Sequence, residues 1–69
     1  PLNNLALLYY GQGKYAEAEP FYKRSLAIVE KALGPDHPNV ATVLKNMAAC
    51  YRKMGKEDEA DKLEARVKK

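Results

Sequence analysis

The chain has few of the residues that usually cross-link a small domain, bind metal ions or catalyse reactions. Its 69 residues include no Trp, one Cys and one His, so no internal disulfide can form and the soft ligands are too few for a structural zinc site. No run of about 18 apolar residues is present, so no membrane-spanning helix is expected. Because the sequence also starts without Met or a secretory signal, we expect a fragment of a longer, cytoplasmic protein.

An excess of one sign of charge is also lacking. The 12 Lys and Arg side chains are nearly balanced by 9 Asp and Glu side chains, and the net charge of +3 is spread over both halves of the chain. Neither half is a basic arm of the kind that binds nucleic acid. Nucleic acid is therefore not the expected partner, and RNA binding by a helical repeat stays a third alternative.

What the chain does contain is helical periodicity, divided by Gly and Pro. Breaks occur at Gly11–Gly13, at Gly34–Pro38 and at Gly55, residues that interrupt regular structure. Between the breaks, apolar residues recur at i, i+3, i+4 and i+7 rather than in alternation, which favours helices over strands. The sequence therefore predicts an all-α chain with helices over about residues 1–12, 14–33, 38–53 and 56–68.

Residues at the breaks are suited to begin and end these helices. Asp36 or His37 is placed to cap the third helix, whose first turn contains Pro38, a position where a missing N–H costs nothing. Gly34 stands where a left-handed residue would close the second helix. Pro20 lies about two turns into that helix and lacks a backbone N–H, so we expect a kink or an irregular first turn there.

The chain repeats itself at an offset of 42 residues. When residues 2–27 are laid on residues 44–69, 9 of 26 positions are identical, whereas chance would give about one or two, and a repeat of this period is typical of a solenoid of stacked helix pairs. We assign a first unit to residues 2–43 and a second, incomplete unit to residues 44–69. The identical positions are Leu2/Leu44, Asn4/Asn46, Ala6/Ala48, Tyr9/Tyr51, Gly13/Gly55, Lys14/Lys56, Glu17/Glu59, Ala18/Ala60 and Arg24/Arg66.

These residues resemble the tetratricopeptide repeat family, which places small residues where two helices cross and aromatic residues in the adjoining holes. The linker Leu33–Pro38 and the 42-residue period resemble the kinesin-light-chain type. The second unit departs from the pattern, because Glu57 and Glu64 replace aromatic residues. The resemblance implies an αα superhelix of about 1.6 repeats in four helices. The matching positions of the first unit are Ala6, Ala18 and Ser25 (small) and Tyr9, Tyr15 and Tyr22 (aromatic).

The resemblance implies a protein-interaction module that docks an extended peptide in its concave groove and needs no cofactor. Asparagine amides can bond a peptide backbone whatever its side chains, and a basic stripe on one helical face favours an acidic peptide. That stripe is formed by Lys45, Arg52 and Lys53. By alignment, the groove positions are Asn3, Leu7, Tyr10, Gly11, Lys45, Ala49, Arg52 and Lys53, with Asn4 and Asn46 at the groove edge.

Catalysis is not expected from this chain. His37 and Cys50 stand 13 residues apart, about 20 Å along a helix, which is too far for a Cys–His dyad. The glycines at Gly11–Gly13 lack the remaining residues of a phosphate-binding loop. We therefore interpret His37 as a linker residue and Cys50 as a small packing residue.

The two ends of the predicted array differ. The last helix offers a narrow apolar stripe on an otherwise charged surface, as a terminal helix of a solenoid requires. The first helix is apolar over most of its circumference, which is typical of an interior helix. We expect the C-terminal part of a longer array. The alternative is a self-associating structural or engineered fragment, a homo-oligomer formed through Leu5, Leu8 and Tyr9.

Overall fold

The protein is described by a computed structural model that covers the backbone of residues 2–67 and the side chains of residues 4–67. Over this range the chain is all-α, as predicted, and contains no strand. Its four helices are α1 (Leu2–Gly11), α2 (Tyr15–Leu33), α3 (Pro38–Lys53) and α4 (Glu57–Val67).

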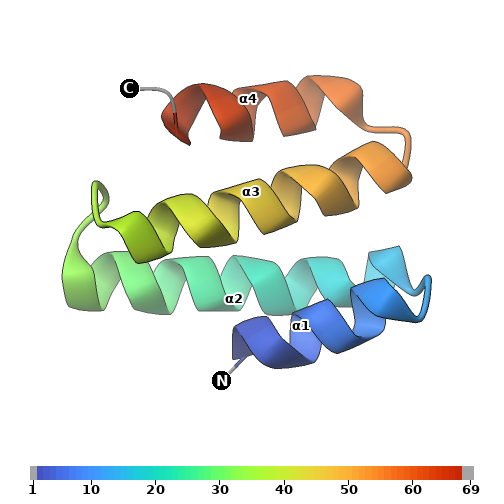
Figure 1. Cartoon of the computed structure of the whole chain (residues 1–69), viewed down its shortest axis with the longest axis horizontal. Coiled ribbons are helices and arrows are strands. Elements are labelled where there is room, and N and C mark those ends of the chain that lie inside the picture. The colour runs from blue at the N-terminus through green and yellow to red at the C-terminus, as the bar shows by residue number, and fades with distance from the viewer. Residues whose placement is uncertain (1, 68–69) are drawn as a thin grey trace.

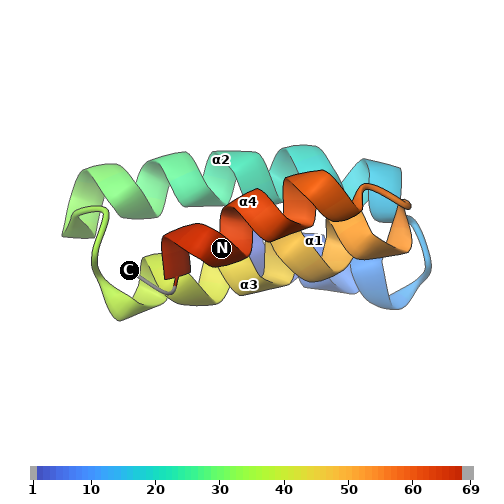
Figure 2. The same cartoon turned by 90° about the horizontal axis from the view of Figure 1, so that it is seen from above.

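Each helix packs against the next, and α1 also touches α3. Seen down its shortest axis, the molecule is a row of helices in the order α1, α2, α3, α4 (Figure 1). Turned by 90°, it shows α2 along one side and α1 with α3 along the other (Figure 2). The shortest of the three dimensions, 30 × 26 × 13 Å, corresponds to two layers of helix backbone, since packed helix axes lie about 8–10 Å apart and the Cα atoms of a helix lie about 2.3 Å from its axis.

Small residues lie where the helices cross. Ala6, Ala18, Ala48 and Ala60 are each at most 1% exposed, and one of them comes from each helix. Their short side chains let the helix axes approach closely, and larger side chains from the neighbouring helices fill the remaining space. The buried larger residues are Tyr22, Val40, Val43, Leu44, Met47, Cys50 and Tyr51.

The turn that joins the two helices of each unit has the same geometry in both units. Gly13 and Gly55 each adopt a φ of +79°, which glycine reaches without strain. The N–H of Lys14 donates to the carbonyl oxygen of Tyr9 (2.9 Å), and the N–H of the equivalent Lys56 donates to that of Tyr51 (2.8 Å). This six-to-one bond is the signature of a Schellman turn. The 42-residue repeat is therefore a repeat of structure as well as of sequence.

The longer linker between α2 and α3 is fixed by its own caps. His37 caps α3, because its Nδ1 accepts a hydrogen bond from the N–H of Asn39 (3.0 Å), and Pro38 occupies the first turn. Gly34 closes α2 with the expected positive φ of +92°, but its ψ of 156° lies outside the left-handed helical region. The chain therefore leaves α2 in an extended direction.

Pro20 lies inside α2 without interrupting it. The residues from Tyr15 to Leu33 form one α-helix, so the irregular first turn that the sequence suggested is not observed. The Pro20 ring is exposed, which places the lost backbone hydrogen bond on the water side of the helix. Water can satisfy the carbonyl that Pro20 leaves without an N–H partner.

Candidate functional site

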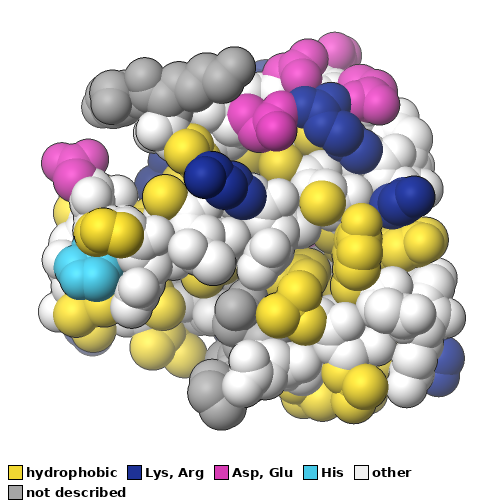
Figure 3. All heavy atoms as spheres, in the orientation of Figure 1, with side chains coloured by type: hydrophobic (Ala, Val, Ile, Leu, Met, Phe, Trp, Pro, Cys, Tyr) yellow, Lys and Arg dark blue, Asp and Glu magenta, His cyan; other side chains and the backbone are white. Residues whose placement is uncertain are grey.

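The predicted groove residues belong to α1 and α3, the two helices on one side of the molecule. On α1, Asn4 and Leu7 are exposed and Tyr10 is half-buried. The side chain of Asn3 lies outside the described residues. Helix α1 touches α3, so the two sets of groove positions belong to neighbouring helices. Figure 3 looks onto the molecule in the same orientation as Figure 1.

On α3, the groove positions combine two lysines with an amide. Lys45 and Lys53 are exposed, whereas Asn46 and Ala49 are half-buried. In the space-filling view, basic side chains stand along α3 and acidic ones gather toward α4 (Figure 3). Lys45 and Lys53 are eight residues apart, just over two helical turns, so they lie on the same side of α3. The face can therefore offer two cations and an amide to one extended ligand.

Arg52 differs from the neighbouring lysines, because its guanidinium forms ion pairs with other residues of the chain. Its guanidinium donates to the carboxylates of Glu57, Asp61 (3.1 Å) and Glu64, all on α4. These bonds, led by the one to Glu57, raise the pKa of Arg52. The three carboxylates follow Arg52 by five, nine and twelve residues in the sequence. These spacings bring the charges together only because α4 folds back on α3.

Three of the four residues of the Arg52 cluster stand at positions that hold tyrosines in the first unit, and the fourth, Asp61, stands where the first unit has Glu19. The equivalent of Arg52 is Tyr10, and the equivalent of Glu57 is Tyr15. Tyr10 and Tyr15 meet edge to face with centroids 5.2 Å apart, and their replacements form an ion pair instead. Glu64 likewise stands where the first unit has Tyr22. An apolar cluster of one unit is therefore an ionic cluster in the next.

Cys50 and His37 both have structural contacts. The Cys50 thiol is buried and donates to the carbonyl oxygen of Tyr15 on α2 (3.2 Å). Burial raises the pKa of this thiol, which keeps it protonated and weakly nucleophilic. His37 uses its Nδ1 to cap α3. Within residues 4–67 no group of three His, Cys, Asp or Glu side chains could hold a metal ion.

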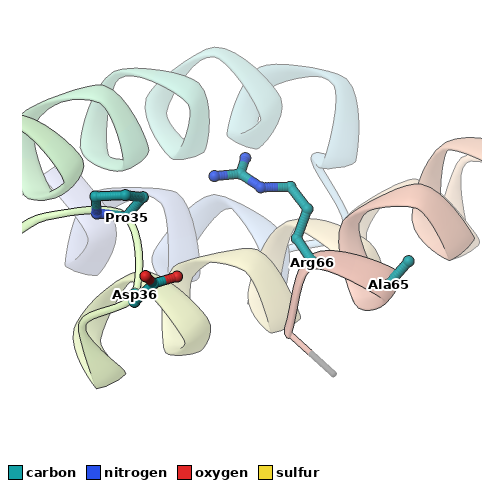
Figure 4. Close-up of a pocket in the computed structure, with 4 residues that line it drawn as sticks. All are labelled: Pro35, Asp36, Ala65 and Arg66. Carbon is teal, nitrogen blue, oxygen red and sulfur yellow. The ribbon is translucent and has the colours of Figure 1, made fainter. Parts of the chain in front are cut away.

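A depression of about 240 Å³ lies between the α2–α3 linker and the end of α4. It is lined by Pro35, Asp36, Ala65 and Arg66, and Asp36 faces the Arg66 side chain across it (Figure 4). The Arg66 guanidinium extends toward α2, where its Nη2 lies 2.5 Å from Oε1 of Glu30. Because this cation is already paired and the depression is shallow, the α1–α3 face is the better candidate for a ligand.

The three residues predicted for self-association separate into two environments. Leu5 and Leu8 are 36% and 56% exposed. Tyr9 instead stacks on Phe21 of α2 with ring centroids 5.4 Å apart, and the Nζ of Lys14 lies 6.0 Å from the centroid of the Tyr9 ring. Tyr9 therefore contributes to the α1–α2 hairpin, and Leu5 and Leu8 are left on its outer side.

Comparison with known families agrees with this architecture. A family model described as tetratricopeptide repeat matches residues 1–67 of the chain. The match covers both helix hairpins, including the charged second one. No helix in residues 2–67 is long and apolar enough to cross a membrane.

Proposed function

Because the chain belongs to the tetratricopeptide repeat family, whose members generally mediate protein–protein interactions, we propose that it binds an extended, preferably acidic peptide. The proposed site is the face of α1 and α3. The observation that carries the proposal is the combination of exposed Lys45 and Lys53 with half-buried Asn46 on one helix. Two cations and an amide match a carboxylate-bearing chain in an extended conformation.

Within this site the lysines and the asparagines have separate tasks. Lys45 and Lys53 attract acidic side chains, an effect that raises the association rate and weakens with salt. Asn4 and Asn46 bond the peptide backbone and therefore tolerate different sequences. Tyr10 and Asn3 complete the site on α1. Arg52 is assigned to holding α4 against α3, since its guanidinium is bound by three carboxylates.

Other features support a finer assignment. The identical turns at Gly13 and Gly55 and the long linker support the kinesin-light-chain-like type, with units over residues 2–43 and 44–69. A buried Cys50 without a disulfide suits a reducing compartment, so we place the protein in the cytoplasm. A family of interaction scaffolds also favours a non-enzymatic role.

The proposal is tested by Asn46→Ala. The probe is a set of fluorescent peptides of about ten residues, graded from acidic to basic, and the measurement is anisotropy with the 69-residue chain. We expect the acidic peptides to bind best, and Asn46→Ala to weaken them about tenfold by removing a backbone hydrogen bond. Unchanged circular dichroism would show that the fold is intact.

Matched lysine variants test the acidic preference separately. Lys45→Gln removes a cation from the proposed site, and Lys31→Gln removes one from exposed surface on α2. We expect Lys45→Gln to weaken the acidic peptides and to reduce the salt dependence, while Lys31→Gln leaves both unchanged. Equal behaviour of the two lysine variants, or equal affinity of Asn46→Ala and the parent chain, contradicts the assigned site.

A second candidate function is self-association through the exposed apolar side of α1. Leu5 and Leu8 stand outside the hairpin core, and hydrophobic side chains reach the edge of the molecule that α1 forms (Figure 3). Exposed leucines of this kind mark contact surfaces more often than isolated apolar residues do. In this role the chain is a structural repeat fragment that forms a homo-oligomer.

A further inference from the structure

The outer side of the first hairpin combines apolar and charged residues in an ordered pattern. Glu17, Phe21, Arg24 and Ile28 follow one another at i, i+4, i+7 and i+11 along α2, so they lie on one stripe of that helix. Phe21 in this stripe stacks on Tyr9 of α1, which places the stripe beside α1. We call the end face the exposed residues of this stripe together with two exposed leucines of α1, namely Leu5, Leu8, Glu17, Arg24 and Ile28.

The second unit shows what the equivalent positions do when a helix covers them. Met47 and Cys50 are the equivalents of Leu5 and Leu8, and they are only 4% and 1% exposed because α3 packs on α2. Arg66 is the equivalent of Arg24, and it binds Glu30 on the same α2. The end face therefore repeats a pattern that, in the second unit, receives a neighbouring helix and a carboxylate.

We infer that two copies of this chain cover each other's end face around a two-fold axis, with Glu17 of each copy paired to Arg24 of the other. Glu17 and Arg24 are about 10.5 Å apart along the helix. A two-fold axis that passes midway between them places Glu17 of one copy opposite Arg24 of the other copy, and Arg24 of the first opposite Glu17 of the second, because a symmetric contact is reciprocal. Neither residue has an ion pair within residues 4–67.

The charges of the two helices favour this arrangement. Helix α1 contains no charged residue, so Leu5 and Leu8 of the two copies meet without repulsion. The reciprocal Glu17–Arg24 pairs flank that apolar centre and set the register of the contact. The inference rests on the second candidate function and adds its geometry and its number of copies.

The opposite end of the molecule prevents growth beyond two copies. There Glu57, Asp61 and Glu64 share one cation, Arg52. A head-to-tail contact would bury these carboxylates against the leucines of the next copy, at a large desolvation penalty. With one end apolar and the other end anionic, the contact closes after two copies and does not form a filament.

The contact is expected to be weak. The molecule is 13 Å thick, so its end is narrow and each copy contributes less than the roughly 800 Å² of a standard interface. A dissociation constant of about micromolar or weaker follows. Analytical ultracentrifugation of the 69-residue chain over a concentration series measures both the constant and the number of copies.

Charge exchange supplies the specific test. Glu17→Arg and Arg24→Glu each turn both reciprocal pairs into repulsive contacts, and we expect each to weaken the dimer about tenfold. The double variant carries both substitutions, restores opposite charges across the axis and should restore the parent dissociation constant. Both side chains are exposed, so circular dichroism should be unchanged. Lys62→Glu, on the exposed surface of α4 and away from the end face, serves as the control and should leave the dimer intact.

The outcomes separate the possible occupants of the end face. A monomer at every concentration overturns self-association as well as the geometry. Species larger than dimers, or a double variant as weak as the single ones, leave self-association standing and overturn the two-fold arrangement. Tight binding of a peptide that copies Tyr15–Leu33 to a monomeric chain identifies a foreign helix as the occupant and also overturns it.

Discussion

At the residue scale, the Tyr22 hydroxyl is the least satisfied group of the described core. The side chain is 1% exposed, and its hydroxyl has no hydrogen-bond partner. Burial raises the pKa of Tyr22 to about 12, with a smaller contribution from Cys50. A buried hydroxyl without a partner loses its bonds to water on folding and gains none in exchange. The buried ring of Tyr22 therefore stabilises the folded state, whereas its unpaired hydroxyl destabilises it.

Tyr22→Phe should therefore leave the protein as stable as before or make it more stable by about 1 kcal/mol. Tyr51→Phe is the matched control, because the Tyr51 hydroxyl is not among the buried groups without a partner, and its pKa is raised by burial and then by the Glu19 carboxylate. Removing that hydroxyl should cost about 1 kcal/mol. Urea unfolding followed by circular dichroism measures both changes, and a loss of stability in Tyr22→Phe would show that its hydroxyl has a partner.

At the scale of the elements, the turns between paired helices are held by backbone geometry more than by packing. A Cβ added at Gly55 would meet nothing within 4 Å, yet the residue has a φ of +79°. The strain of a larger residue there would come from its own backbone. Gly11 also has open space around it, but it lies inside α1 with a negative φ.

Gly55→Ala should thus destabilise the protein by about 1 kcal/mol, because alanine in the left-handed region is strained. Gly11→Ala should be neutral or stabilising by up to about 1 kcal/mol, since alanine is the better helix former. Thermal unfolding of the two variants beside the parent chain gives the comparison. Similar losses in both would mean that the turn conformation does not distinguish the two glycines.

Sequence reasoning reached the elements more readily than their contacts. Gly13, Gly34 and Gly55 indicated where helices end because positive φ favours glycine, and the repeat indicated how the helices pair. The cluster around Arg52 was missed, since its three carboxylates lie on α4 and reach Arg52 only because the turn at Gly55 folds α4 back on α3. Basic residues at helical spacing predict a basic stripe. Whether each of them is free to bind a ligand depends on the acidic residues of the neighbouring helix, which can pair with it. The assigned peptide contacts stay a prediction.

At the scale of the whole molecule, the contact between α2 and α3 joins the two units and contains most of its buried ionisable groups. Tyr22 comes from α2, and Cys50 and Tyr51 come from α3. Burial is the largest cause that raises the pKa of each of the three. All three groups are neutral when protonated, so the packed contact between the units favours their protonated forms.

Stability should therefore fall at alkaline pH. The unfolded chain releases these protons near the ordinary values of 9.0 for the thiol and 10.0 for the phenols, whereas the folded chain holds them to higher pH. Above pH 9 the folded state binds more protons than the unfolded state, and its free energy of unfolding decreases as the pH rises. Urea midpoints between pH 8 and pH 11 measure this slope, and Tyr22→Phe should make it shallower. A flat profile would contradict the burial of these groups.

The shallow depth of the molecule has a consequence for how such a protein gains stability. A globular domain that grows becomes thicker, and a rising share of its residues loses contact with water. A row of hairpins 13 Å deep lengthens without thickening, so each new hairpin adds one junction and the same amount of wetted surface. Its free energy of unfolding therefore increases with each contact between neighbouring hairpins. Where one such contact is weak, the hairpins on its two sides can unfold separately.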